Sequence, residues 1–348
     1  MLLLVLLAGC NQPPGQPPLP TLSPQPTPSD EAIWEVSVYF TDPTHPNAGA
    51  FRGGPDAYLA EAIDQAQTSV DAAIFDLNLW SIRDALVAAH KRGVAVRVVT
   101  ESDNLDEAEI KDVKEAGIPV LGDRREGLMH NKFVVIDSLD VWTGSMNFTT
   151  TDGYLNDNNL VHLRSSKLAQ NYTVEFKEMF EEDLFGPDVR SATPFPRFQV
   201  NQVLVENFFS PDDGTASRLE ELASSAEHSL YFLAFSFTSD TLAQALLERA
   251  AAGVIVAGVF EESQVISNIG SEYQRLLDAG IDVRLDSNPR NMHHKVLLID
   301  DRIVVFGSYN FSSSAENRND ENTIILTDPH IAAQFLQEFQ HIFKLAHR

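Results

Sequence analysis

A histidine and a lysine separated by one residue occur twice in the chain, and an aspartate follows each pair at the same distance. Alternate side chains of a β-strand share one face, so the His and Lys of each pair lie side by side. Lysines neutralise phosphate oxygens, and imidazoles act as nucleophiles or transfer protons near pH 7. If the two copies meet in one cleft, the sequence predicts phosphate-ester chemistry there. The motif residues are His130, Lys132, Asp137, His293, Lys295 and Asp300.

A Gly-Ser-x-Asn-Phe segment follows each motif. Turns of this composition supply small polar donors for the remaining oxygens of a phosphate. We therefore expect a substrate-binding role for the serine and asparagine of each segment. Asp137 and Asp300 belong to the candidate catalytic set by motif, but we interpret them as mainly structural groups that accept backbone or basic partners at strand ends. The four segment residues are Ser145, Asn147, Ser308 and Asn310.

The two motifs belong to a longer internal repeat. Residues 68–75 correspond to 228–235, and the Gly-Val steps at Gly93 and Gly253 follow at about the same spacing. The Ala-Gly-Ile segments at 116–118 and 279–281 also correspond. We therefore divide the globular part into repeat 1, residues 31–198, and repeat 2, residues 199–348, each the size of a small domain.

Short β-branched runs alternate with helical patterns in each repeat, which predicts an α/β fold with a helix-flanked sheet per repeat. Strands are predicted at 34–40, 69–75, 94–100, 132–137 and 159–163, and then at 202–209, 229–236, 254–260, 295–300, 302–306 and 323–327. Helices are predicted at 55–67, 80–92, 105–116 and 166–183, and then at 216–226, 240–251, 270–279 and 329–345.

The pattern H-x-K-x4-D with a following G-S-x-N, found twice and in order, resembles the signature of the phospholipase D superfamily. The resemblance implies two mixed sheets in α-β-α sandwiches that pack about a pseudo-twofold axis, with the active site between them. It also implies that one histidine attacks phosphorus to give a phosphohistidine while the other protonates the leaving alcohol. No metal or cofactor is implied.

In the superfamily, a carboxylate in a downstream N-x-E-N segment holds the catalytic imidazole. Glu321 takes this position in repeat 2, whereas repeat 1 has Asn158, which we also include among the substrate-binding candidates. We expect Glu321 to contact His293 and Asn158 to contact His130. A carboxylate favours the imidazolium form, so this pairing predicts His130 as the nucleophile and His293 as the acid. His294, next to His293, is expected on the opposite face.

The composition narrows the substrate class. Asp and Glu number 50 against 25 Lys and Arg, and the net charge of −25 disfavours nucleic acid as a partner without excluding it. We expect a monomer that hydrolyses phospholipid head groups, releasing phosphatidic acid from a phosphatidylcholine-type lipid. A nuclease and a phosphatidyl transferase of the cardiolipin synthase kind are the alternatives within the superfamily. A lipoprotein that only binds is a further alternative, which the intact His-Lys pairs disfavour.

The N-terminus resembles a bacterial lipoprotein signal peptide. An apolar run at 2–8 leads into Leu7-Ala8-Gly9-Cys10, and Cys10 is the only cysteine of the chain. No Lys or Arg precedes the apolar run, as a secretory segment needs. We expect a signal peptide at 1–9 and a lipidated Cys10 that anchors the protein to a membrane of the cell envelope. The eight prolines within residues 13–28 make 10–30 a linker.

Overall fold

The first half of the chain folds into a seven-stranded mixed sheet. This computed structural model describes residues 33–348. The strands β2, β3 and β4 are parallel, and the remaining pairings are antiparallel. In spatial order the sheet contains β1 (Glu35–Phe40), β7 (Asn159–Arg164), β6 (Asp140–Gly144), β5 (Lys132–Ile136), β2 (Ser69–Ile74), β3 (Ala95–Thr100) and β4 (Val120–Gly122).

The second half repeats this strand order and adds one strand at an edge. The added strand, β8 (Arg197–Val200), forms an antiparallel pair with β9. The sheet then continues through the counterparts of β1, β7, β6, β5, β2, β3 and β4, which are β9 (Val203–Ser210), β15 (Glu321–Thr327), β14 (Ile303–Gly307), β13 (Lys295–Ile299), β10 (Ser229–Ala234), β11 (Ile255–Phe260) and β12 (Asp282–Leu285). The predicted pair of helix-flanked mixed sheets is confirmed.

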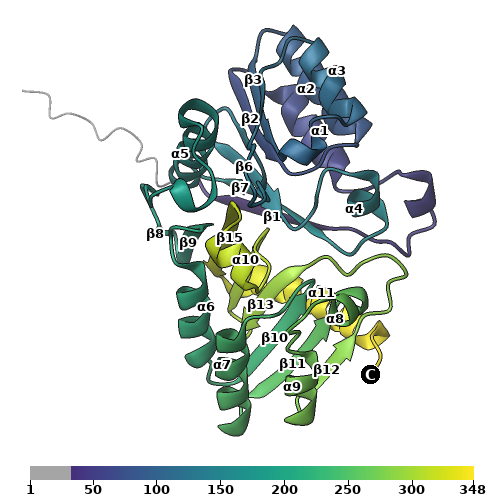
Figure 1. Ribbon diagram of the computed structural model, residues 1–348, viewed down its shortest axis with the longest axis vertical. Helices are drawn as coiled ribbons and strands as arrows, with labels where there is room; N and C mark the ends of the chain where they lie inside the picture. Colours follow the sequence, from purple (N-terminus) through teal and green to yellow (C-terminus); the bar gives the residue numbers. More distant parts are fainter. Residues whose placement is uncertain (1–32) are drawn as a thin grey trace, which may run out of the picture. The chain divides into compact units, whose positions relative to one another are not determined.

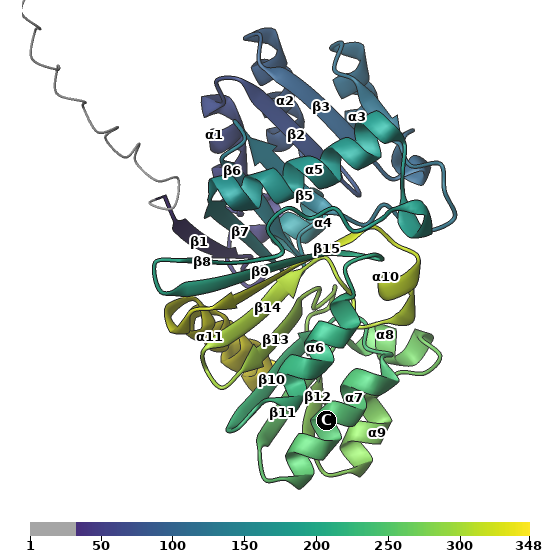
Figure 2. The same ribbon diagram turned by 90° about the vertical axis from the view of Figure 1, so that its left-hand side faces the viewer.

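Three apolar clusters hold the layers together. One joins the first sheet to its outer helices, and a second does the same for the second sheet. The outer helices gather at opposite ends of the molecule (Figures 1 and 2). They are α1 (Asp56–Gln65), α2 (Trp80–Lys91) and α3 (Ala108–Glu115) in the first half, and α6 (Thr215–Ser224), α7 (Asp240–Ala251) and α9 (Tyr273–Asp278) in the second.

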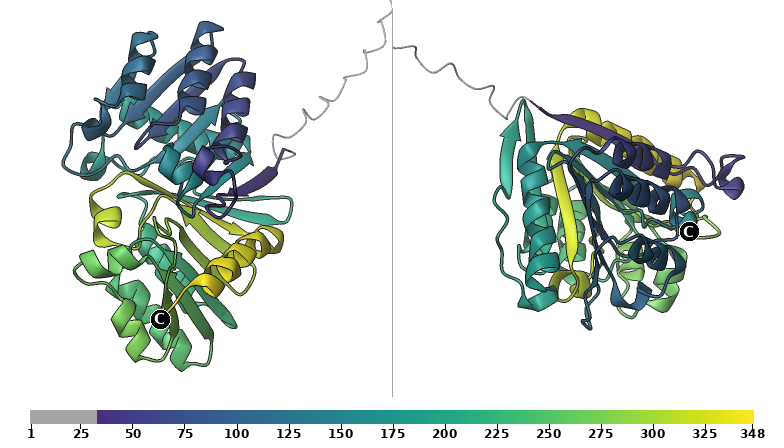
Figure 3. Two further views of the ribbon diagram at one scale, coloured as in Figure 1. Left: turned by 90° about the vertical axis from the view of Figure 1, so that its right-hand side faces the viewer. Right: turned by 90° about the horizontal axis from the view of Figure 1, so that it is seen from above.

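The third cluster contains residues of both halves. It includes the two long helices α5 (Ser166–Glu182) and α11 (Pro329–Leu345), and α11 lies across the strands of the second sheet (Figure 3). Tyr172 of α5 meets Phe209 of β9 edge to face, with ring centroids 5.0 Å apart. Phe40 of β1 meets Phe335 of α11 in the same manner at 5.2 Å. Each such aromatic pair stabilises the folded state by about 0.5–1.5 kcal/mol beyond the effect of its buried area. Because both pairs join one half to the other, the halves share one core.

Short elements escaped the sequence analysis. The strands β4, β6, β8 and β12 have three to five residues, too few for a periodic pattern to stand out. Among residues 33–348, no helix is long and apolar enough to cross a membrane. The remaining short elements are α4 (Thr150–Tyr154), α8 (Glu262–Ser267), α10 (Ser313–Asn317) and the 3-10 turns Ala48–Ala50, Ser102–Asn104 and Gly186–Asp188.

Candidate active site

Backbone hydrogen bonds between the halves bring the two motifs together. The N–H of His130 donates to the carbonyl of Asp320 at 3.0 Å, and the N–H of His293 donates to the carbonyl of Asp157 at 2.9 Å. In return, Asp320 donates to Leu128 and Asp157 to Asn291, both at 2.9 Å. Each histidine is therefore fixed by the half that does not carry it.

His130 is held by a carboxylate of the second half. Its Nδ1 lies 2.9 and 2.8 Å from the two carboxylate oxygens of Glu321, which is fully buried. The hydroxyl of Ser308 donates to Glu321 Oε2 at 2.6 Å, and Asn319 Nδ2 donates to Oε1 at 3.4 Å. With Nδ1 directed at Glu321, Nε2 of His130 is the ring nitrogen left for a substrate.

His293 is held by two side chains of the first half. Its Nδ1 lies 3.0 Å from Asn158 Oδ1 and 3.2 Å from Asp152 Oδ1. Asn158 Nδ2 donates to Asp152 Oδ1 at 2.8 Å, and the hydroxyl of Ser145 donates to Asn158 Oδ1 at 2.8 Å. Asp152 and Asn158 thus form one connected acceptor pair beside the imidazole.

The predicted pairing of the histidines was wrong. Glu321 contacts His130 and not His293, and Asn158 contacts His293 and not His130. The physical reason is a pair of parallel bridges between the halves, Met129 with Asp320 and Asp157 with Met292. Each bridge places the segment just before a downstream strand against the motif of the other half. A strand pattern in the sequence specifies faces but not the partner across an interface.

The lysines lie on the same faces as their histidines and are as buried. Lys132 Nζ donates to the carbonyl of His130 at 2.7 Å, and Lys295 Nζ donates to that of His293 at 2.8 Å. Burial lowers the pKa of Lys132 to about 8. Burial also holds the pKa of Lys295 well below its usual value, and the charge of Lys132 adds to this effect. Two desolvated ammonium groups that repel each other are suited to binding an anion.

Burial lowers the pKa of both histidines, but their neighbours act differently. For His130 the next largest influence is Glu321, which opposes the shift. For His293 it is Lys295, which adds to the effect of burial, and the pKa falls to about 4 although Asp152 opposes the shift. The charge of Lys295 also acts on His130, and that of Lys132 on His293, so the four groups form one electrostatic site. At neutral pH His293 is the imidazole with the freer lone pair.

Two aromatic rings at the site were not singled out from the sequence. The Phe75 ring lies 5.0 Å from the His130 ring and 4.8 Å from Lys132 Nζ. The Phe235 ring lies 4.5 Å from the His293 ring and 4.6 Å from Lys295 Nζ. Each phenylalanine ends the strand beside its motif and stabilises the ammonium through the face of its ring. Their equal places in the repeat were the available signal.

Three predicted substrate-binding residues have a different place in the structure. Ser145, Ser308 and Asn158 are fully buried, and their polar atoms bond to the groups that hold the histidines. They support the groups that orient the imidazoles and do not face a substrate. Asn147 is half-buried and donates from Nδ2 to Asp152 at 2.9 Å. Asn310 is also half-buried, and the Oδ1 atoms of both asparagines are buried without a hydrogen-bond partner among the described residues.

Asp137 and Asp300 lie at the far ends of the motif strands from the histidines and are not catalytic groups. Asp137 Oδ1 accepts the backbone N–H of Thr68 at 2.7 Å, and Asp300 Oδ1 accepts that of His228 at 2.7 Å. Burial alone would raise the pKa of both carboxyls, but these backbone hydrogen bonds outweigh it and lower the pKa. Their predicted structural role is confirmed, whereas their place in the catalytic set is corrected.

Other features of the motifs follow from packing. His294 is fully buried on the opposite side from His293, where its Nδ1 lies 2.9 Å from Asn159 Nδ2. A Cβ at Gly144 would strike the carbonyl oxygen of Asn159, and the backbone there has a φ of 157°, so the G-S turn needs glycine. Within residues 33–348, no cluster of three His, Cys, Asp or Glu side chains could hold a metal ion.

Comparisons with known proteins agree with this geometry. Residues 59–180 and 219–343 match the family model described as "Cardiolipin synthase, PLD-like domain". The "Phospholipase D" of Rickettsia bellii is 30% identical over 163 residues, which are 45% of this chain and 81% of that protein. The "Mitochondrial cardiolipin hydrolase" of Chlamydomonas reinhardtii is 32% identical over 137 residues, 39% of this chain and 61% of that protein.

A solved structure shares the fold of nearly the whole chain. The phosphatidylserine synthase of Haemophilus influenzae superposes with a TM-score of 0.67 at 16% identity, covering 89% of this chain and 86% of that one. Two helix-flanked mixed sheets, each with one His-Lys motif, and the family match define a two-half enzyme of the phosphodiester-acting type. The chain belongs to the phospholipase D superfamily, within the family of cardiolipin synthase, PLD-like domains.

Proposed function

We propose that the protein is a phosphodiesterase that hydrolyses phospholipid head groups through a phosphohistidine intermediate. The observation that carries the proposal is the crossed support of the two imidazoles: each presents Nδ1 to polar groups of the other half, beside a buried lysine. Neither half holds a complete site. A diester phosphate placed between the imidazoles would meet a nucleophile on one side and a proton donor on the other.

The electrostatics assign the two roles in the opposite way to the sequence analysis. His293, whose pKa lies at about 4, attacks phosphorus with Nε2, and the bond from phosphorus to the head-group oxygen breaks. His130, beside both oxygens of Glu321, gives its proton to that oxygen, and the alcohol leaves. His130 then takes a proton from water, whose oxygen attacks phosphorus and frees His293 and a phosphatidic acid. Lys132 and Lys295 neutralise the phosphate oxygens throughout.

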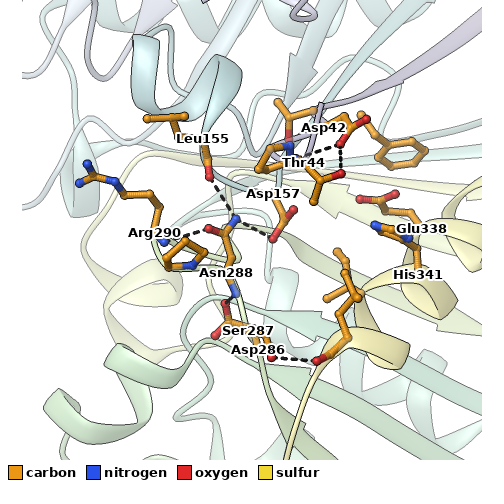
Figure 4. Close-up of a pocket in the computed structure, with 16 residues that line it drawn as sticks. Asp42, Thr44, Leu155, Asp157, Asp286, Ser287, Asn288, Arg290, Glu338 and His341 are labelled. Atoms are coloured by element: carbon orange, nitrogen blue, oxygen red, sulfur yellow. Dashed lines mark hydrogen bonds between the residues drawn. The ribbon is translucent and has the colours of Figure 1, made fainter. Parts of the chain in front are cut away.

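A large acidic cavity adjoins the motif segment of the second half, although no motif histidine or lysine lines it. It has a volume of about 810 Å³ and is lined by both halves (Figure 4). Asp157 lines it, and the carbonyl of Asp157 accepts the N–H of His293, so the cavity adjoins the segment that carries that histidine. Its charged and titratable lining is Asp42, Asp157, Asp286 and Glu338 against Arg290 and His341. Such a lining attracts a choline-type cation and repels a polyanionic strand.

A substrate panel tests this proposal. We expect release of choline from phosphatidylcholine vesicles, and hydrolysis of a chromogenic phosphodiester, at rates unchanged by excess chelator, because the lysines supply the positive charge. At low salt, nicking of supercoiled plasmid should be slower than choline release, since the charge of −25 repels DNA and is little screened. Plasmid nicking without choline release would replace the lipase proposal with the nuclease. Transfer to glycerol in place of water would favour the phosphatidyl transferase.

The names of the matched relatives support a phospholipid substrate, since they include a phospholipase D and a cardiolipin hydrolase. The cardiolipin-type reaction remains the second candidate, and cardiolipin vesicles therefore belong in the panel. Hydrolysis of cardiolipin in preference to phosphatidylcholine would favour an anionic lipid over the cationic head group that the cavity supports.

Cys10 and the predicted signal peptide and linker lie outside the described residues. We propose that Cys10 carries a lipid that anchors the enzyme to a membrane of the cell envelope, on the strength of the Leu7-Ala8-Gly9-Cys10 box. We expect the protein made from its natural start in a bacterial host to partition into detergent in phase separation. Cys10→Ser should move it to the aqueous phase while cleavage of the chromogenic diester is retained. Equal partitioning of both proteins would contradict lipidation.

A further inference from the structure

The two halves hold their histidines with different pairs of residues at corresponding positions. The first half has Asp152 and Asn158. The corresponding residues of the second half are Ala315 and Glu321, which follow them along the chain at the distance that separates His130 from His293. Each half therefore contains one carboxylate in this pair of positions, on helix α4 in the first half and at the start of strand β15 in the second.

Asp152 lies against His293, and its charge also acts on the buried Lys132 and Lys295. It lies in the first turn of α4 with its side chain buried, and its Oδ1 lies 3.2 Å from Nδ1 of His293. Asn147 and Thr149 donate to Oδ2 at 2.9 and 3.1 Å, and Asn156 donates to Oδ1 at 3.0 Å. Burial alone would raise the pKa of Asp152, but His293 and these hydrogen bonds outweigh it and lower the pKa, so the carboxylate is ionised.

We propose that Asp152 is the positioning residue of His293, and that it replaces in the first half the carboxylate that Glu321 provides in the second. Nδ1 of His293 is hydrogen-bonded to Asn158 and lies 3.2 Å from Asp152, and these two acceptors hold the ring proton on that nitrogen and leave Nε2 unprotonated toward the phosphate. The proposal rests on the proposed function for its kinetic consequence, but the state of the imidazole is measurable without turnover.

Positions 158 and 321 have corresponding hydrogen-bond donors around them, so exchanging the residues between the halves tests the proposal. Ser308 and Asn319 donate to Glu321, and their counterparts in the first half are Ser145 and Asn156. A glutamate at position 158 would therefore meet the same donors that Glu321 meets. The double variant Asp152→Ala/Asn158→Glu gives the first half the arrangement of the second.

We expect Asp152→Ala to lower kcat by about 10²-fold, since a misoriented imidazole loses most of its contribution to catalysis. Asp152→Ala/Asn158→Glu should recover to within about 10-fold of the parent protein, because the carboxylate returns to His293 from the other position. Activity of the double variant no higher than that of Asp152→Ala would overturn the proposal. So would an Asp152→Ala variant with unchanged kcat and pH profile.

The conservative variant Asp152→Asn gives a readout that loss of folding cannot mimic. The charged groups acting on His293 are Asp152 of α4, Lys295 of β13 and Lys132 of β5. Removal of the only negative charge among them lowers the pKa of His293 further, so the limb of the pH–rate profile that His293 governs should move to lower pH. An unmoved limb would mean that Asp152 does not act on His293.

Nuclear magnetic resonance of the imidazole nitrogens separates this inference from the proposed function. In the parent protein, Nδ1 of His293 should carry the proton at neutral pH, and in Asp152→Ala the two ring tautomers should mix. The double variant should restore the single tautomer. If the parent protein cleaves no diester but shows these changes, the proposed function fails and the positioning role stands. An unchanged tautomer in Asp152→Ala sinks the positioning role whatever the activity.

The second half offers the mirror-image control. Around Ala315 it has Asn310, Ser312 and Asn319, the counterparts of Asn147, Thr149 and Asn156, which are three of the residues that bond to Asp152. Glu321→Asn should lower kcat by about 10²-fold through His130. Ala315→Asp/Glu321→Asn should recover part of that loss, because the new carboxylate meets equivalent donors. Recovery in neither exchange would show that the two halves are not interchangeable and would contradict the relocation of the carboxylate.

Discussion

We expect His130→Ala and His293→Ala each to lower turnover of a phosphodiester substrate by about 10³-fold or more. The reason is that the two histidines belong to one site: each has its Nδ1 held by the opposite half, and the lysine of each motif acts electrostatically on the histidine of the other. A half that kept its own histidine, lysine and aspartate would still lack either the nucleophile or the acid.

The measurement is the steady-state rate of choline release at saturating lipid, with thermal unfolding as a check that each variant is folded. His228→Ala is the matched control, because His228 is exposed just before β10 and its hydrogen bond to Asp300 comes from the backbone N–H, which the substitution keeps. The control should keep the parent rate. If either motif variant retains more than about a tenth of the parent rate, the shared site is refuted, since loss of a nucleophile or acid costs far more.

Much of this site was readable from the sequence because the repeat doubles every signal. One His-Lys pair on a strand is a common pattern, but a second pair at the same offset, with the same downstream turn, fixed both the fold and the chemistry. The strands carrying the motifs were found near their observed bounds, since four buried apolar residues in a row follow the lysine in β5 and in β13.

The partners of the histidines were not readable in the same way. The sequence places Glu321 in the repeat of His293, and nothing along the chain shows that the start of β15 crosses to Met129. Asp152 was missed for a related reason. Its helix, α4 (Thr150–Tyr154), is little more than one turn long, and its N-cap explains Thr149 but not the aspartate. Only alignment of Asp152 with Ala315, together with the missing carboxylate at Asn158, would have drawn attention to it.

The roles of the two histidines separate when the leaving group needs no proton. A nitrophenolate leaves without an acid, so His130→Ala should still release one equivalent of nitrophenolate from a nitrophenyl phosphodiester in a rapid burst. Hydrolysis of the phosphohistidine should then stall, because His130 is the group that takes the proton from water. His293→Ala should give no burst, since it lacks the nucleophile. The phosphoryl group in quenched His130→Ala should be found on His293 by mass spectrometry.

The direction of this result follows from the charges around each ring. Burial lowers the pKa of His293 to about 4, and the charge of Lys295 acts in the same direction. Burial also lowers the pKa of His130, but Glu321 opposes this effect, so His130 is the imidazole that holds a proton more readily. Glu321→Gln removes that support and lowers the pKa of His130, so the basic limb of the pH–rate profile should move to lower pH. A burst from His293→Ala, with phosphate on His130, would reverse the assignment and show that bound substrate, rather than the resting charges, decides which imidazole attacks.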